Sequence, residues 1–336
     1  MHQANPVTLS KRGLSQALLA AVLLPVGLLV GPPAFADEAA GYPTRPVSVT
    51  VCFLPGASTD ALARRIGERL ATSLGRPVVV ENRGGNLAAS RIAKAAPDGH
   101  SLLFCATGGL VVAAAARTPL DFDPQRDLAT VAPAGDLAVL LLVRPTLPAQ
   151  TLREFVDHAR ANPGQLNFGS IGVGSSFHLA IEQINAAAGV SMTHVPFCGG
   201  GPVMLELLAG RLDAVFASLS LGKPHILAGT VRPLAAAGEA RFPELPAVPT
   251  LAEAGLPGIW LQERLGFFVP AGTPPPIITR LNAEISRIVA EPAMREWMVS
   301  QGIPPSPSSP EAFRATLDEG TRVLGELIRK LGLRLE

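Results

Sequence analysis

The chain has 336 residues, with 28 Lys or Arg against 27 Asp or Glu, so its formal net charge at pH 7 is +1. Hydrophobic residues make up 48% of it, and its 33 glycines and 32 prolines are spread along the chain rather than clustered. This composition is typical of a globular protein, and the balanced charge argues against a nucleic-acid-binding surface. A chain of this length can form one large domain or two lobes.

The first 36 residues have the pattern of a secretory signal peptide. Lys11-Arg12 gives a positive start, residues 17–30 are largely apolar, and Ala34-Phe35-Ala36 is an A-x-A cleavage site. The apolar run is shorter than the ~20 residues that a membrane span needs. We therefore expect an exported mature chain of residues 37–336. Because the removed segment has two basic and no acidic residues, the net charge becomes −1.

The most informative stretch combines a strand, a turn and a helix start. The apolar Val47–Cys52 predicts a strand, Pro55-Gly56 a turn, and Ser58-Thr59-Asp60 the start of a helix, because these side chains accept hydrogen bonds from free N–H groups. A glycine-containing turn before a helix N-terminus is an anion site, since N–H donors and the positive end of the helix dipole converge there. An ordinary strand–helix loop fits these residues equally well.

Strands and helices alternate along the rest of the chain. This alternation predicts parallel, doubly wound sheets that bind ligands at the carboxyl ends of their strands, where the turns Pro55–Asp60 and Ala106–Gly109 fall. Thr151 is expected to cap one helix, and Ser175 or Ser176 another. The further expected strands are 77–81, 101–105, 137–143, 166–169, 193–196, 211–216, 231–236 and 266–270, and the expected helices are 87–96, 152–161, 177–188, 203–209, 274–288 and 311–331.

The pattern divides into two α/β units, the second inserted into the first. We expect the chain to cross between them near Leu137 and Gln262, which gives a first lobe of residues 37–137 and 263–336 and a second lobe of residues 138–262. Two lobes joined by two strands form a hinged cleft.

Three cysteines in an exported chain leave at least one thiol unpaired. Cys52 and Cys105 end two of the expected strands. If these strands are neighbours, a disulfide is feasible provided that the Cα atoms lie within ~7 Å. Two buried free cysteines that pack as small hydrophobic residues fit the sequence equally well.

Motifs that would indicate an enzyme are missing from the sequence. It has no G-x-S-x-G, P-loop, G-x-G-x-x-G, C-x-x-C or H-E-x-x-H pattern, and Gly222-Lys223-Pro224 is interpreted as a turn. We therefore expect no catalytic residue, metal or cofactor. A Cys–His hydrolase using Cys198 and His178 is the alternative, but neither residue has a recognisable orienting partner. His178 is expected to support its loop from behind, and the remaining histidines of the mature chain are expected to be structural or on the surface: His100, His158, His194 and His225.

Each expected lobe contributes a glycine- and serine-containing loop that leads into a helix. These loops are Pro55–Asp60 and Ser170–Ser176, and neither contains Arg or Lys. Recognition would then depend on N–H and hydroxyl donors, which suits a carboxylate better than a cluster of phosphates.

Nine short phrases occur in an order that is similar to that of a known family. They are Tyr42-Pro43-x-x-Pro46, Pro55–Asp60, Val80-Glu81-Asn82-Arg83, Ala93–Gly99, Asn162-Pro163-Gly164, Gly169–Ser175, His194-Val195-Pro196-Phe197, Val248-Pro249-Thr250 and Pro270–Pro274. Over residues 42–330 the chain resembles the extracytoplasmic receptors of tripartite tricarboxylate transporters, the Bug-type solute-binding proteins.

The resemblance implies a two-lobed periplasmic-binding-protein fold of type II, with two doubly wound α/β domains joined by a two-strand hinge. It implies a monomeric periplasmic receptor that closes on a small mono-, di- or tricarboxylate or an amino acid and delivers it to the membrane subunits of a transporter. A receptor that signals to a sensor kinase is the alternative. The implied ligand contacts are Gly56, Ala57, Ser58, Thr59 and Asp60 in the first lobe, Thr107 and Gly108 in a third loop, and Gly174, Ser175, Ser176, His178, Phe197 and Gly199 in the second lobe.

The sequence departs from the family pattern in four places, all near the expected cleft. Gly56-Ala57 stands where two glycines are usual, Cys52–Pro55 where Pro-Phe-Pro-Pro is usual, and Gly84-Gly85-Asn86 is a shortened glycine-rich segment. Phe197-Cys198 stands where Tyr-Lys is usual, which removes a cation and a hydroxyl group. These departures predict a more apolar pocket and leave the identity of the ligand open.

Overall fold

The computed structural model describes residues 41–53, 55–56, 58–118 and 120–333. The expected signal peptide, Leu54 and Ala57 lie outside the described residues. Within the described part of the chain, none of the helices combines the length and the hydropathy that crossing a membrane requires.

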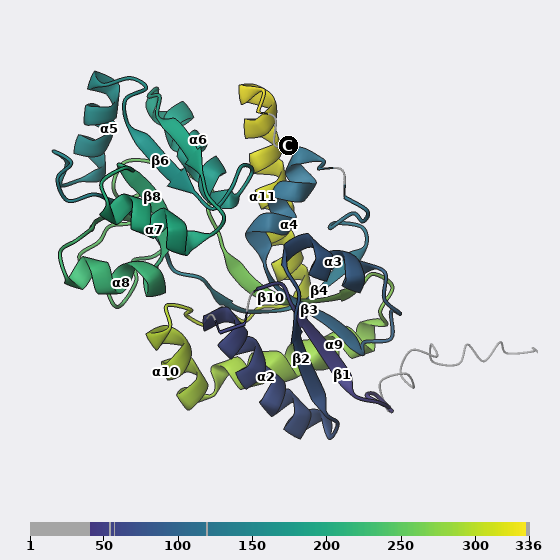
Figure 1. The fold of residues 1–336 in the computed structure, drawn as a ribbon. Coiled ribbons are helices and arrows are strands. Elements are labelled where there is room, and N and C mark those ends of the chain that lie inside the picture. The colour runs from purple at the N-terminus through teal and green to yellow at the C-terminus, as the bar shows by residue number, and fades with distance from the viewer. Residues whose placement is uncertain (1–40, 54, 57, 119, 334–336) are drawn as a thin grey trace, which may run out of the picture. The chain divides into compact units, whose positions relative to one another are not determined.

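The first sheet has five strands in the order β2-β1-β3-β10-β4 (Figure 1). β1 pairs in parallel with β2 and β3, whereas β10 pairs antiparallel with β3 and β4. We call this sheet with its helices the first lobe. Its strands are β1 (Val47–Val51), β2 (Val78–Asn82), β3 (Ser101–Ala106), β4 (Leu128–Asp136) and β10 (Arg264–Pro270), and its helices are α2 (Ser58–Leu74), α3 (Gly85–Ala93), α4 (Thr107–Ala116), α9 (Pro275–Ala290), α10 (Pro292–Ser300) and α11 (Pro310–Leu331).

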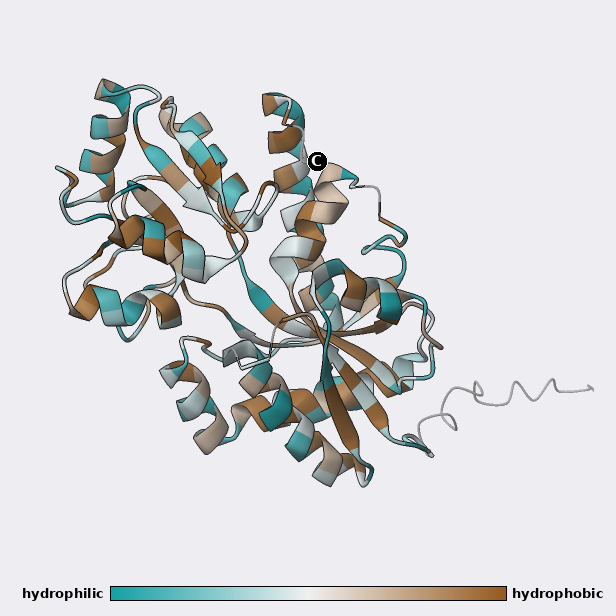
Figure 2. Ribbon diagram, viewed as in Figure 1, coloured by the Kyte–Doolittle hydropathy of each residue, from teal (hydrophilic) through white to brown (hydrophobic). Residues whose placement is uncertain are grey.

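Helices cover both faces of this sheet because its strands are hydrophobic on both sides. Leu102 and Phe104 of β3 pack in one buried cluster with residues of α2 and α9, while Leu103 and Cys105 pack in another with residues of α3, α4 and α11. Successive residues of a strand point to opposite faces, so a run of apolar residues forms two cores. The brown strands of Figure 2 show this pattern.

The second sheet has the order β7-β6-β8-β5-β9. β5 lies inside the sheet, is buried along its whole length, and runs antiparallel to β8 and β9. We call this sheet with its helices the second lobe. Its strands are β5 (Val139–Val143), β6 (Asn167–Ser170), β7 (Thr193–Pro196), β8 (Ala214–Ser218) and β9 (Arg232–Ala237), and its helices are α5 (Leu152–Ala161), α6 (Ser176–Ala188), α7 (Gly200–Leu208) and α8 (Leu219–Leu227).

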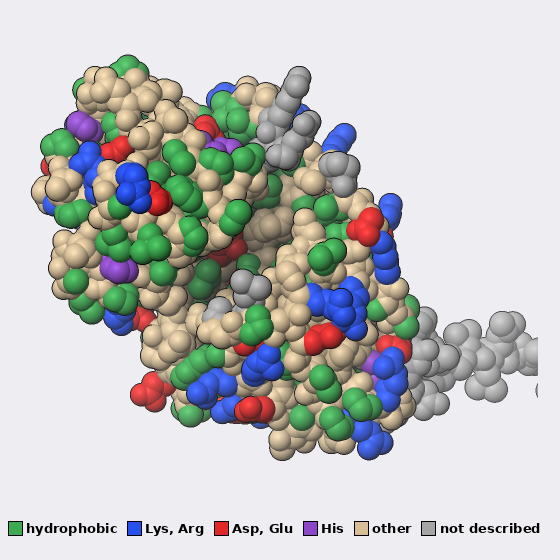
Figure 3. All heavy atoms as spheres, viewed as in Figure 1, with side chains coloured by type: hydrophobic (Ala, Val, Ile, Leu, Met, Phe, Trp, Pro, Cys, Tyr) green, Lys and Arg blue, Asp and Glu red, His purple; other side chains and the backbone are tan. Residues whose placement is uncertain are grey.

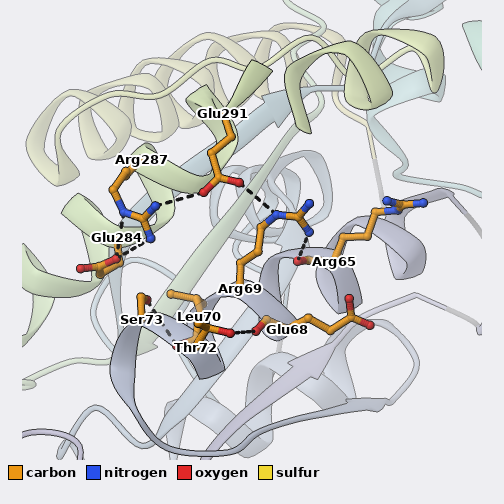
Figure 4. A network of polar contacts seen from close by, with 9 residues as sticks. All are labelled: Arg65, Glu68, Arg69, Leu70, Thr72, Ser73, Glu284, Arg287 and Glu291. Atoms are coloured by element: carbon orange, nitrogen blue, oxygen red, sulfur yellow. Dashed lines mark hydrogen bonds and ion pairs between the residues drawn. The ribbon is translucent and has the colours of Figure 1, made fainter. Parts of the chain in front are cut away.

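A network of ion pairs braces α2, the helix that follows the first candidate loop (Figure 4). Arg69 Nε donates to Glu291 Oε2 at 3.1 Å, and Arg287 reaches the other oxygen of the same carboxylate at 3.0 Å. One turn earlier in α2, the Arg65 guanidinium lies 4.4 Å from the centre of the Trp297 ring. These contacts fix α2 against α9 and α10, away from its N-terminal end.

The expected parallel pairing is confirmed between β1 and its neighbours β2 and β3 and between β6 and its neighbours β7 and β8, but each sheet also contains antiparallel pairs. β10 follows the return from the second lobe, so no helical crossover connects it to its neighbours and it enters the sheet antiparallel. β5 enters the second sheet directly after β4 and is antiparallel for the same reason.

Four elements were not expected from the sequence: β4, α4, α8 and α10. β4 contains Pro133 and Gly135, which a strand tolerates here because β4 is at the edge of its sheet. The expected turn Ala106–Gly109 contains the first turn of α4, and the expected turn Gly222-Lys223-Pro224 lies inside α8. The strand expected from Leu137 begins only at Val139.

The cysteine pairing that the sequence left open is a disulfide between Cys52 and Cys105, whose Cα atoms are 5.2 Å apart. β1 and β3 are neighbours in the sheet, which brings their carboxyl ends together. Cys198, the third cysteine, is free and exposed. The disulfide therefore ties the start of the β1–α2 loop to the sheet.

Candidate functional site

The β1–α2 loop is organised by the carboxylate of Asp60, the third residue of α2, which is only 4% exposed. It accepts hydrogen bonds from the Gly56 N–H at 3.0 Å, Asn82 Nδ2 at 2.8 Å and Arg64 Nε at 3.2 Å. Burial raises the pKa of Asp60, but these donors outweigh burial and hold it below its usual range. The Asp60 carboxylate is thus ionised at neutral pH, and its hydrogen bonds are made to groups of the protein itself.

Two hydroxyl groups at the N-terminus of α2 remain available in this loop. Thr59 is 7% exposed, and its Oγ1 has no hydrogen-bond partner in the described structure. Ser58, the first residue of α2, is half-buried. Together with the free N–H groups of the first helical turn, they form a set of donors without a cation.

The β6–α6 loop of the second lobe is shaped by Ser175. Its Oγ accepts from the His178 N–H at 3.2 Å, which makes it the N-cap of α6, and donates to the Gly172 carbonyl oxygen at 2.8 Å. Gly172 and Gly174 have φ angles of +137° and +71°, which residues with a side chain rarely adopt. Of the two capping serines that the sequence offered, Ser175 is confirmed.

Two stacked imidazoles, the buried His178 and the half-buried His194, support this loop from behind. His178 Nδ1 accepts from the Gly174 N–H at 3.1 Å, and the His178 ring stacks on His194 with 3.8 Å between ring centres. His194 Nε2 lies 2.7 Å from Ser170 Oγ. Burial and, secondarily, His194 lower the pKa of His178 to about 4. His178 is therefore neutral at pH 7, and its Nδ1 is used to hold the loop.

The second-lobe helix α7 begins with an open N-terminus. Gly199 is its N-cap with a φ angle of +109°, and no side chain caps the helix. Nothing lies within 4 Å of the position where a Cβ would stand at Gly199 or Gly201. The half-buried Phe197 and the exposed Cys198 precede these glycines. The N–H groups of this first turn form a second set of donors without a cation.

Glu263 joins the two lobes where the chain returns to the first sheet. Its carboxylate accepts from the Gly108 N–H at the start of α4 and from the hydroxyl of Ser176, the first residue of α6. Burial raises the pKa of Glu263 to about 7, against the opposite effect of the two donors. A Cβ on Gly108 would lie 1.9 Å from Glu263 Oε1, so only glycine allows this approach.

Thr107 is also part of this crossing. It is 3% exposed, and its Oγ1 accepts from the Arg264 N–H at 3.2 Å and donates to the Gln262 carbonyl oxygen at 3.4 Å. The polar groups of Thr107, Gly108 and Ser176 are therefore already bonded within the protein.

Glu263 was missed by the sequence analysis. The available signal was the polar run Gln262-Glu263-Arg264 immediately before an apolar strand, at the expected crossing. A cavity of about 390 Å³ adjoins the same crossing. Its walls come from both crossing segments and from the residues after β9, and they are Asp136, Leu137, Ala237–Pro243, Leu261, Gln262, Glu263, Arg264 and Pro304.

Figure 3 shows a hollow between α7 with the β6–α6 loop on one side and α3 with α4 on the other. Hydrophobic side chains gather on its second-lobe border. In the β6–α6 loop, Ile171 is 37% and Val173 is 49% exposed, and Leu87 near the start of α3 is 76% exposed. Large apolar side chains thus remain exposed at strand ends of both lobes.

The described residues contain no group of three or more His, Cys, Asp and Glu side chains that could hold a metal ion. They also show no hydrogen bond between Cys198 and His178, whose Nδ1 is occupied by the Gly174 N–H. Cys198 and His178 therefore do not form a hydrogen-bonded pair in the described part of the chain.

Two α/β lobes linked by two crossing segments define the class of periplasmic solute-binding proteins with the type II fold. A family model described as tripartite tricarboxylate transporter family receptor matches residues 62–333. The chain belongs to this family, which includes the Bug-type receptors.

Similar proteins support this assignment. The chain is 39% identical over 276 residues to the "UPF0065 protein in tcbD-tcbE intergenic region" of Pseudomonas sp. strain P51, covering 81% of this chain and 82% of the relative. It is 32% identical over 299 residues to the protein BugT of Bordetella pertussis, covering 88% and 92%.

Two solved structures from Rhodopseudomonas palustris are similar as well. Rpa4515 with adipate has a TM-score of 0.75 at 32% identity and covers 87% of this chain and 98% of its own. MatC (Rpa3494) with bound malate has a TM-score of 0.73 at 33% identity and covers 85% and 100%.

The contact between Gly108 and Glu263 predicts a position-specific effect of an added methyl group. Gly108→Ala should lower the free energy of unfolding by about 1–3 kcal/mol, because the Cβ overlaps Glu263 Oε1. Gly109→Ala, the neighbouring control with open space at the Cβ position, should leave stability unchanged or raise it by up to ~1 kcal/mol. Denaturant unfolding of both variants measures this. Equal changes in the free energy of unfolding for Gly108→Ala and Gly109→Ala would contradict the contact. A double variant, Gly108→Ala with Glu263→Ala, gives a second test: if its loss of stability equals the sum of the two single losses, the residues do not interact.

The pKa of His178 predicts a loss of stability in acid. Its ordinary value is 6.5 and its folded value is about 4, so the unfolded chain binds more protons between these pH values. The contribution of His178 is therefore complete above pH 6.5 and is lost as the pH falls towards 4. His194, whose pKa burial also lowers, acts in the same direction, while the raised pKa of the neighbouring Glu182 acts against it.

Unfolding curves between pH 4 and pH 7.5 test this prediction. His178→Gln should flatten the pH dependence, whereas the control His225→Gln in α8 should leave it as in the wild type. If the free energy of unfolding of His178→Gln depends on pH as steeply as that of the wild type, the acid sensitivity comes from other groups.

Proposed function

We propose that this protein is an extracytoplasmic receptor that captures a small carboxylated solute between its two lobes and delivers it to the membrane subunits of a tripartite tricarboxylate transporter. One observation carries the proposal. The N-termini of α2 and α7, one from each lobe, present N–H and hydroxyl donors without a cation, and Thr59 Oγ1 is buried without a partner among the described residues. Such donors bind a carboxylate and leave no group for catalysis.

Family membership supports the same function. Rpa4515 and MatC, two structural neighbours, carry adipate and malate, which are both carboxylates. We infer that residues 1–36 are a signal peptide, that the mature chain acts in the periplasm as a monomer, and that its lobes comprise residues 37–137 with 263–336 and residues 138–262.

The predicted ligand contacts take different parts in this proposal. Ser58 and Thr59 of the first lobe and Phe197 and Gly199 of the second lobe would touch the solute, and Gly56, whose N–H is bonded to Asp60, would line the site. Asp60, Gly174, Ser175 and His178 would hold the two loops in shape, as their internal hydrogen bonds support. Thr107, Gly108 and Ser176 would hold the two crossing segments together through their internal hydrogen bonds. Ala57 remains a predicted contact of the solute.

A thermal-shift screen of the protein against mono-, di- and tricarboxylates and amino acids tests the function. A ligand at 100 times its dissociation constant should raise the free energy of unfolding by ~2.7 kcal/mol. Ser58→Ala with Thr59→Ala should reduce this shift, because both hydroxyls lie at the N-terminus of α2. The matched control is Thr72→Ala with Ser73→Ala at the other end of the same helix. If no acid shifts the protein, or if the control pair weakens binding equally, the proposed site is wrong.

A further inference from the structure

A carboxylate of the protein already occupies the donors at the crossing between the lobes. Glu263 is 8% exposed, and its carboxylate lies between the N-terminus of α4 in the first lobe and the N-terminus of α6 in the second. Its partners are a first-turn N–H group, from Gly108, and a serine hydroxyl, from Ser176. A backbone N–H and a hydroxyl at helix N-termini are the donors with which a protein binds the carboxylate of a ligand.

Two donor sets remain for the solute: the N-terminus of α2 with Ser58 and Thr59, and the first turn of α7. Asp60 uses Arg64 and the Gly56 N–H, so these groups are not free for a solute. The segments Cys52–Asp60, Ala106–Gly109, Ser170–Ser176 and Pro196–Gly201 contain no Arg or Lys. An exposed cation, Arg83, follows β2 on the first-lobe side. The exposed guanidinium of Arg83 and the N-terminus of α2, which both favour a bound anion, therefore lie in the first lobe.

Besides the N–H groups of the first turn of α7, the second lobe offers apolar contacts. Ile171 and Val173 stand exposed in the loop that precedes α6, and Phe197 follows the neighbouring strand β7. Leu87 adds an exposed apolar side chain from the first lobe. Exposed apolar side chains at a binding edge are stabilised when a hydrocarbon group covers them, because apolar surface is removed from water.

We propose that the solute is a monocarboxylate with an uncharged, apolar body, and that the Glu263 side chain takes the place where the second carboxylate of a dicarboxylate would bind. The inference rests on the proposed receptor function. The one carboxylate of the ligand takes up both open donor sets, at the N-termini of α2 and α7, and its body lies against Ile171, Val173 and Phe197. A second carboxylate would have to displace Glu263 from its donors or stand beside it, and two like charges at one site repel each other.

Hexanoate and adipate test this directly, because both have six carbons and differ by one carboxylate. Calorimetric titration of the full protein at pH 8, where Glu263 is largely ionised, should show hexanoate binding at least tenfold more tightly. Tighter or equal binding of adipate would overturn the inference and leave the receptor function standing. Binding of neither acid would overturn the inference, and the thermal-shift screen would then decide the receptor function separately.

Two substitutions of Glu263 separate its shape from its charge. Glu263→Ala frees the Gly108 N–H and the Ser176 hydroxyl and should shift the ratio of the two affinities at least tenfold towards adipate. Glu263→Gln keeps a side chain on the same donors and should shift the ratio much less. An unchanged ratio in Glu263→Ala, with folding confirmed by circular dichroism, would overturn the role of Glu263. If Glu263→Ala does not fold, the ratio of the hexanoate and adipate affinities of the wild-type protein decides whether the inference stands.

The apolar side of the proposal has its own matched pair. Ile171→Ser with Val173→Ser should weaken hexanoate binding several-fold, whereas Leu227→Ser, an exposed leucine at the end of α8, should not change it. Equal effects of the two changes, or no effect of the loop variant, would contradict an apolar body lying on this loop.

Discussion

A buried carboxylate, that of Glu263, accepts hydrogen bonds from the N-terminal ends of two helices that belong to different sheets. Its geometry requires a glycine at position 108, because any Cβ there would overlap Glu263 Oε1. Nearby, Leu179 of α6 packs with Val111 and Val112 of α4 and Leu324 of α11. The crossing is therefore a packed and hydrogen-bonded joint, and removing one partner would leave a buried polar group unsatisfied.

This joint uses Ser176 of the β6–α6 loop but not the donor sets at the N-termini of α2 and α7. α2 is braced near its C-terminal end by Arg69 and Glu291, and its N-terminal loop is closed by Asp60 and tied to the sheet by the Cys52–Cys105 disulfide. The β6–α6 loop is held by Ser175 and His178. Each loop is thus preorganised by internal hydrogen bonds, which reduces the entropy lost when a ligand binds.

Much of the fold could be predicted from local sequence. The helix starts at Thr151 and Ser175, and the strands that precede them, follow from capping residues and short apolar runs. β4 was missed because Pro133 and Gly135 normally interrupt a strand, and its position at the edge of the sheet explains why they are tolerated. α4 was missed because Gly108-Gly109 normally marks a turn, and the close approach of Glu263 explains why glycine stands at position 108.

The two candidate loops were predictable because each combines glycine with helix-capping residues over a few positions. The role of Glu263 was not, because its partners Gly108 and Ser176 are far from it in the sequence and no periodicity connects them. The free hydroxyl of Thr59 likewise depends on burial, which capping patterns do not reveal.

The most direct test of this account is a crystal structure of the protein with hexanoate. We expect the carboxylate within hydrogen-bond distance of Ser58 or Thr59, the methyl end against Ile171 and Val173, and Glu263 still bonded to Gly108 and Ser176. A ligand carboxylate bound to Gly108 and Ser176, with the Glu263 side chain displaced, would contradict it.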